Sequence, residues 1–292
     1  MIELVAHPVA VPTVGRSTLG ESPRWDSRTQ QLWWTDIEGR AIHTLLPGGD
    51  SISYALPRAV GAIMLADDGL VLATTRGFES FDPSTERLET LVAIEEADDS
   101  RRMNDASVDA LGALLGGTMR WDAGTGEPDG ALYRYRRDGQ VEVVFGGLGC
   151  PNGLAWPRPD LFVFIDSLSG GIDLWNIDTA SGAVIDRAHR IDTSAFQGIP
   201  DGLTVDESGR LWVAFWGGGV VRCFELDGTV AATVTVGTAL VTSATFGGTD
   251  LGTLYITTAA HGSGHEGAGD LYEVRPGVAG REPNIYEVGA RP

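Results

Sequence analysis

Cysteine is scarce in this chain of 292 residues, which contains only Cys150 and Cys223. Two thiols cannot build a disulfide framework or a CxxC-type zinc site, so buried reduced thiols are expected. The motifs GxSxG, HExxH and GxxxxGK[ST] are also missing. Their absence argues against serine hydrolases of the α/β type, zincin metalloproteases and P-loop NTPases.

Basic residues are few as well, with 21 Lys and Arg against 40 Asp and Glu and a net charge of −19. Solvated turn aspartates explain most of this acidity. The resulting field repels nucleic acid and anionic lipid and attracts cations, so no nucleic-acid or membrane partner is expected. The longest uncharged stretch, residues 228–249, alternates small and apolar residues in the manner of strands.

The N-terminal segment lacks a basic region followed by an apolar run, so no signal peptide is expected. A cytoplasmic location is the simplest expectation. Oligomeric state is not predicted from the sequence.

Glycine is abundant, with 40 residues, and a turn rich in Asp and Gly followed by a short apolar strand recurs six times. The repeats align at Leu32, Leu70, Ala113, Leu161, Leu211 and Leu254. Steps of about 40 to 50 residues are typical of a four-stranded propeller blade. The sequence therefore predicts an all-β, six-bladed β-propeller with four-stranded blades, occupying residues 1–292 as a single domain.

Closure of such a ring needs the two ends of the chain to meet. We expect Glu3–Pro8 to pair with C-terminal strands around Leu271–Val274 and Ile285–Val288, because this pairing would remove an exposed sheet edge. Residues 94–101 are expected to form a short helical or loop excursion.

Four short segments carry polar residues where an innermost strand begins. They are LGESPRW with Glu21, RMND with Asn104, CPNGLAW with Asn152 and IPDGLTVD with Asp201. Because innermost strands line the central channel, these oxygen-bearing side chains should converge at one mouth. Carboxylate and amide oxygens form a site for a hard divalent cation. The alternative is that Pro-Asn-Gly and Pro-Asp-Gly are only turn tripeptides.

The sequence also resembles the SMP-30/gluconolactonase/luciferin-regenerating-enzyme family, the regucalcin-like proteins, over essentially its whole length. The resemblance rests on GESPRWD at 20–26, RMNDASVDALGALLGGTM at 102–119, PNGLAW at 151–156, IDSLS at 165–169, PDGLTVDESGRLWVAFWGGGVVRCF at 200–224, and TSATFGG and LYITTA further on. It implies that Glu21, Asn152 and Asp201 bind one divalent metal. Ca²⁺ is the first expectation, with Mg²⁺, Mn²⁺, Zn²⁺ and Fe²⁺ as alternatives.

By the same resemblance, Arg102, Asn104 and Asp105 face the substrate or metal-bound waters. Family members carry an acidic residue shortly after the GTM segment, and here Asp122 or Glu127 is expected in that role. A competing reading of Arg102 is a surface ion pair with Asp98 and Asp99. Trp121, Trp216 and Phe215 are expected either to narrow the cleft or to pack in the core.

The function implied is metal-dependent hydrolysis of a small sugar lactone, with Asp201 as the general base. Two other functions remain open at this stage. One is a non-catalytic metal-binding propeller, and the other is hydrolysis of acyclic esters or phosphotriesters in the same cleft. Turnover of a lactone panel separates these possibilities.

Overall fold

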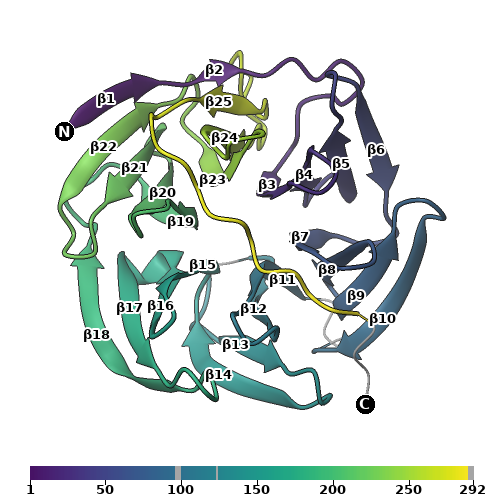
Figure 1. The fold of residues 1–292 in the computed structure, drawn as a ribbon, viewed down its shortest axis with the longest axis vertical. Helices are drawn as coiled ribbons and strands as arrows, with labels where there is room; N and C mark the ends of the chain where they lie inside the picture. The colour runs from purple at the N-terminus through teal and green to yellow at the C-terminus, as the bar shows by residue number, and fades with distance from the viewer. Residues whose placement is uncertain (96–99, 123, 289–292) are drawn as a thin grey trace.

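Six β-sheets are arranged around a central axis in the computed structural model, which describes residues 1–95, 100–122 and 124–288 (Figure 1). Blades 1 and 2 comprise β3 (Gly20–Asp26), β4 (Gln31–Asp36), β5 (Ala41–Leu45), β6 (Ser51–Ala55), β7 (Val60–Leu65), β8 (Leu70–Thr74), β9 (Gly77–Asp82) and β10 (Arg87–Ala93). Blades 3 and 4 comprise β11 (Arg101–Val108), β12 (Leu114–Arg120), β13 (Gly130–Tyr135), β14 (Val141–Leu148), β15 (Pro151–Arg158), β16 (Leu161–Asp166), β17 (Gly171–Ile177) and β18 (Val184–Asp192). Blades 5 and 6 comprise β19 (Ile199–Val205), β20 (Leu211–Trp216), β21 (Val220–Phe224), β22 (Val230–Thr235), β23 (Val241–Gly247), β24 (Thr253–Thr258) and β25 (Tyr272–Val274).

The six-bladed propeller predicted from the repeats is therefore confirmed. Each blade begins at its innermost strand and runs outward in antiparallel order. The aligned leucines lie at the first or second position of the second strand of their blades, and Ala113 directly precedes β12. The repeat was visible because each blade uses the same turn and the same apolar second strand.

The hydrophobic core lies between the blades. Six buried clusters can be distinguished in the described chain, and each joins residues of two neighbouring blades. Phe215 and Cys223, for example, are fully buried in blade 5. The expectation that Phe215 narrows the cleft is wrong, because its ring packs against Phe224 and Phe196 in the core.

Two N-terminal strands, β1 (Ile2–Val5) and β2 (His7–Pro8), close the ring. The strand β2 pairs antiparallel with β25, placing His7 opposite Glu273, so the predicted pairing with Leu271–Val274 is confirmed. The strand β1 pairs parallel with β22 as a fifth strand of blade 5. Both ends of the chain thus contribute to the last two blades.

The predicted pairing with Ile285–Val288 is wrong. Tyr286 instead forms a parallel bridge with Ala66 of blade 2, because the chain after β25 crosses the face of the ring. Residues 279–288, here named the C-terminal strap, pass in front of the central axis in Figure 1. Along the way Gly280 bridges to Asp206, and the Asn284 side-chain amide donates to the carbonyl oxygen of Val108 at 2.9 Å. The strap therefore covers one end of the channel.

Helical structure is limited to one 3₁₀ turn, η1 (Ser167–Ser169), in the part of the chain that the structure describes. No helix in these ranges is long and apolar enough to cross a membrane. Four of the eight residues in the excursion expected at 94–101, residues 96–99, lie outside the described ranges, and so do Asp98 and Asp99 as proposed partners of Arg102.

Deleting residues 1–8 is expected to lower the melting temperature by roughly 10 °C. The deletion removes the ladders of β1 with β22 and β2 with β25 and leaves two unpaired sheet edges. Differential scanning calorimetry measures the change. The control is Val5→Ala, since Val5 is 61% exposed and its loss should move the transition by no more than about 1 °C. An unchanged transition after the deletion would show that ring closure does not depend on these strands.

Candidate functional site

The innermost strands β3, β7, β11, β15, β19 and β23 contact one another around the channel. All six run in the same direction, so their first residues meet at one end, here named the open mouth. Glu21 is the second residue of β3, Asn152 the second of β15, Asp201 the third of β19 and Asn104 the fourth of β11. The structure therefore brings together the residues that the sequence placed at the starts of the innermost strands.

A β-bulge interrupts each of these four strands beside the polar residue. The register with the second strand shifts between Glu21 and Arg24, Met103 and Ala106, Asn152 and Leu154, and Pro200 and Leu203. A bulge bends the strand locally and turns a side chain away from the alternation of the sheet. It explains how polar residues on buried strands come to point along the channel.

The glycines that follow Asn152 and Asp201 are required by the close approach of neighbouring strands. A Cβ atom on Gly153 would lie 2.9 Å from the carbonyl oxygen of Asp201, and one on Gly202 would lie 2.2 Å from Oγ of Ser243. Both glycines lie inside strands β15 and β19. The reading of Pro-Asn-Gly and Pro-Asp-Gly as turn tripeptides is therefore wrong.

Two aspartates at the ends of second strands fix the segments that lead into the site. Asp36 accepts the backbone N–H groups of Thr18 and Leu19 at 2.8 and 3.0 Å, just before Glu21. Asp166 accepts those of Gly149 and Cys150 at 3.1 and 2.7 Å, just before Asn152. These bonds hold the entering backbone, because buried N–H groups need partners.

The side chain of Asn152 is oriented by its neighbours. Its amide nitrogen donates to Oγ of Ser167 at 2.8 Å. Its oxygen accepts a 3.0 Å bond from the amide nitrogen of Asn104, which also donates to the carbonyl of Pro151 at 2.8 Å. The oxygen of Asn104 in turn accepts from Arg102. The network fixes the side chain of Asn152 so that its oxygen faces Asn104 and its amide nitrogen faces Ser167.

The side chains of Glu21 and Asp201 are only 8% and 6% exposed, and their negative charges repel each other. Burial raises the pKa of Glu21 from its ordinary value of 4.5 to about 8, and the charge of Asp105 adds to the shift. Burial and the charge of Glu21 raise the pKa of Asp201 well above its usual range. Arg102, itself buried with a pKa lowered by desolvation, counters only part of this repulsion. Arg24 also lowers the pKa of Glu21, but burial and the repulsion between carboxylates outweigh both guanidinium groups.

This arrangement fits a hard divalent cation. Within the described ranges, no three His, Cys, Asp or Glu side chains form a metal-binding cluster on their own. Two buried carboxylates and one amide oxygen remain as candidate ligands, and oxygen ligands of this kind suit Ca²⁺, Mg²⁺ or Mn²⁺. A cation placed there would counter both the burial and the repulsion that raise the two pKa values.

The raised carboxyl pKa values predict how stability depends on pH when no cation is bound. The folded protein keeps protons on Glu21 and Asp201 at a pH where the unfolded chain has lost them, so it binds more protons. Stability should then fall as the pH rises from about 5 to about 8. Melting curves in chelator at several pH values measure this slope, and either Ca²⁺ or Glu21→Gln should flatten it. A melting temperature that rises across this window would contradict the assignment.

The remaining predicted residues divide between the site and the surface. Asp105 lies on β11 beside the cluster, where burial raises its pKa and Arg24 lies 3.8 Å from its Oδ1. Asp122, by contrast, has a 53% exposed side chain paired with Arg120, and hydrogen bonds from Arg120 and Thr125 lower its pKa. Glu127 is exposed in the same loop. The structure does not bring these last two acids into the buried cluster.

At the open mouth the sequence singled out Arg102, Trp121 and Trp216, but not His261 and Glu38. The guanidinium of Arg102 lies 5.0 Å from the centre of the Trp121 ring, which is 44% exposed. On the opposite rim, Nδ1 of His261 lies 3.3 Å from Glu38, and its ring meets the edge of Trp216. The strand order could have located these residues. The loop between the second and third strands of each blade lies at the open mouth.

Fold and site together define a six-bladed propeller with an acidic, oxygen-lined centre at one mouth. Residues 19–260 match the family described as SMP-30/Gluconolactonase/LRE-like region, and the chain belongs to this family. It is 34% identical to the pentonolactonase of Haloferax volcanii over 256 residues, 86% of each chain. It is 32% identical to the regucalcin of Danio rerio over 282 residues, 93% of this chain and 95% of that one.

Among solved structures, the calcium-binding protein regucalcin of Agrobacterium tumefaciens has 26% identity to this chain. It superimposes with a TM-score of 0.89 over 98% of this chain and 99% of its own. The family resemblance inferred from the motifs is thus confirmed, and the relatives span essentially the whole propeller.

Proposed function

We propose that this protein hydrolyses small sugar lactones to open-chain hydroxy acids, using one divalent cation bound by Glu21, Asn152 and Asp201. The observation that supports this most is the convergence of two buried carboxylates and an oriented amide oxygen at the open mouth. A relative named as a pentonolactonase adds the substrate class. The oxygen-only ligand set and a relative named as calcium-binding favour Ca²⁺.

A divalent cation held by Glu21, Asn152 and Asp201 would supply Lewis acidity for the ester carbonyl and for a water molecule. Asp201 has two carboxylate oxygens, so one can bind the cation while the other accepts a proton from the attacking water. The same oxygen can then deliver this proton to the ring oxygen of the lactone as the C–O bond breaks. The proton taken in the first step is thus returned in the second.

Arg102 and Asn104 are placed to hold the substrate. The guanidinium of Arg102 is fixed between Asn104 and the ring of Trp121, and its Nε has no partner within the described protein. A guanidinium held in this way beside the cluster can donate from its remaining N–H groups to a substrate hydroxyl or carbonyl. Positioning of the ester beside Asp201 lowers the entropic cost of the reaction.

A panel of lactones tests the proposal. Gluconolactone, xylonolactone and galactonolactone, followed with a pH indicator in the presence of Ca²⁺, Mn²⁺, Mg²⁺ or Zn²⁺, should include at least one that is opened well above its spontaneous rate. The panel also includes an acyclic ester and a phosphotriester. Turnover of only these two compounds would assign a different hydrolase to the cleft. No turnover with any cation, despite cation binding, would identify a non-catalytic metal-binding propeller.

A further inference from the structure

A cavity lies at the other end of the channel from the open mouth, beneath the C-terminal strap. Its volume is about 310 Å³, within the range of small-molecule sites. It is formed by the last residues of β3, β11, β15, β19 and β23 together with residues 281–284 of the strap. None of its lining residues belongs to the cluster of Glu21, Asn152 and Asp201 at the open mouth.

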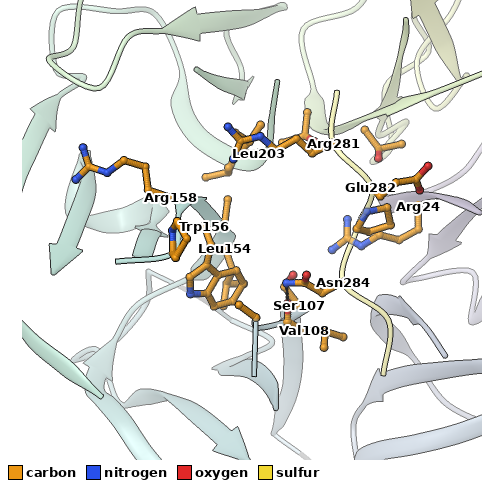
Figure 2. A pocket seen from close by; sticks show the side chains of 17 residues that line it. Arg24, Ser107, Val108, Leu154, Trp156, Arg158, Leu203, Arg281, Glu282 and Asn284 are labelled. Carbon is orange, nitrogen blue, oxygen red and sulfur yellow. Dashed lines mark hydrogen bonds between the residues drawn. The ribbon is translucent and has the colours of Figure 1, made fainter. Parts of the chain in front are cut away.

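Positive charge gathers around this cavity although the whole protein carries −19. Arg24, Arg158 and Arg281 line it with one carboxylate, Glu282 (Figure 2). Arg158 is paired with Asp160 at 3.2 Å, so the excess of positive charge comes from Arg24 and Arg281. Glu282 already accepts the hydroxyl hydrogen of Ser27, whose oxygen lies 2.7 and 2.8 Å from the two carboxylate oxygens. The local excess of cations is opposite to the charge of the molecule as a whole, so it needs an explanation specific to this place.

Two of these arginines are held mainly by neutral acceptors. Arg281 donates to the carbonyl oxygens of Pro157 and Glu207 at 2.7 and 3.0 Å. Arg24 donates to the carbonyl oxygens of Pro23 and Ala106 at 2.9 and 3.0 Å, and its only carboxylate contact in the described protein is 3.8 Å long. These bonds fix the guanidinium groups in place without neutralising them, although the charge of Arg24 is also felt by Asp105 and Glu21.

The opposite side of the cavity is apolar. Leu154, Leu203 and Val108 line it, together with the ring of Trp156, which stacks on Phe162 at 5.0 Å and so cannot turn away. Figure 2 shows Leu154 and Trp156 on one side of the cavity and Arg24 on the other. A bare inorganic anion would leave this apolar surface without a partner.

From this combination we infer that the cavity binds a small organic carboxylate, with its charge at Arg24 and Arg281 and its carbon chain against Trp156 and Leu154. The site is separate from the proposed lactone site and does not depend on it. Hydroxy acids and unsubstituted short-chain acids share the chemistry required.

Isothermal titration calorimetry with hexanoate, gluconate and inorganic phosphate tests the inference. One equivalent of hexanoate or gluconate should bind, and Arg281→Gln should weaken this binding at least fivefold. Arg87→Gln is the matched control, since Arg87 is 69% exposed on the outermost strand β10 and pairs with Glu89. The affinity of this variant for the acids should stay within twofold of that of the unsubstituted protein. The two acids distinguish an unsubstituted from a hydroxylated ligand, and binding of either supports the site. Phosphate binding as tight as that of both acids would overturn it.

Because Arg281 also anchors the strap, a second variant addresses the cavity without removing an anchor. Ala110→Trp places a large ring at an exposed lining position and should abolish binding while the melting temperature is retained. Asp201→Asn should leave carboxylate binding unchanged. Loss of binding in Asp201→Asn, or full binding in Ala110→Trp, would place the anion elsewhere and overturn the inference, whatever the outcome of the lactone assays.

Discussion

Asp201→Asn is expected to lower kcat for lactone hydrolysis by about three orders of magnitude while the propeller stays folded. The substitution keeps the shape of the side chain and its position on β19. It removes the negative charge and the proton acceptor, and both are needed if this group moves the proton from water to the ring oxygen. Because the charges of Glu21 and Asp105 repel the carboxylate of Asp201, loss of this charge relieves repulsion and should not lower stability.

Initial rates on the best lactone of the panel, with the cation at saturation, measure this effect. Asp227→Asn is the matched control. It makes the same change of a carboxylate to an amide, but in the exposed hairpin between β21 and β22. Its kcat should remain within about twofold of the unsubstituted protein. An Asp201→Asn protein that keeps more than a tenth of the activity would remove the general-base assignment.

Removal of the cation is expected to have the second largest effect. Exhaustive chelation should reduce turnover to the spontaneous rate and added Ca²⁺ should restore it, because the remaining residues offer no other Lewis acid for the carbonyl. Glu21→Gln should weaken Ca²⁺ binding by at least about 100-fold. Substitution of a residue that only orients a metal ligand costs up to about 100-fold, and loss of a ligand itself should cost at least as much. The affinity of the unsubstituted protein should rise with pH, since Glu21 and Asp201 must lose protons to bind the metal.

Calorimetric titration of Ca²⁺ into the chelator-treated proteins gives these affinities directly. Glu207→Gln serves as the control, because Glu207 is an exposed carboxylate outside the cluster and should not change them. Equal affinities for Glu21→Gln and the unsubstituted protein would exclude Glu21 as a ligand.

The fold could be predicted from the sequence because its determinants are local and repeated. Each blade uses a tight turn, an apolar second strand such as the one from Leu211, and a spacing that recurs six times. Pairing of β2 with β25 followed from the need to cover an edge. The path of the strap could not be predicted from the sequence. Its bridge from Tyr286 to Ala66 joins segments 220 residues apart that share no sequence pattern.

The site was predictable only in part for a similar reason. Glu21, Asn152 and Asp201 stand in short motifs at equivalent places in three blades, so their convergence follows from the symmetry of the ring. The bulges that aim them depend on the register with the second strand, which no motif encodes. Asp122 was expected near the substrate from its distance after GTM; its side chain is 53% exposed and paired with Arg120, outside the buried cluster. Loop conformation depends on contacts, and sequence distance does not determine it.

The account depends above all on three oxygens sharing one ion. A crystal of the protein with Ca²⁺, measured at a wavelength where calcium scatters anomalously, tests this most directly. We predict one strong anomalous peak about 2.3 to 2.6 Å from carboxylate oxygens of Glu21 and Asp201 and from the amide oxygen of Asn152. A peak bound by other residues, or an ordered open mouth with no peak at saturating Ca²⁺, would contradict the account.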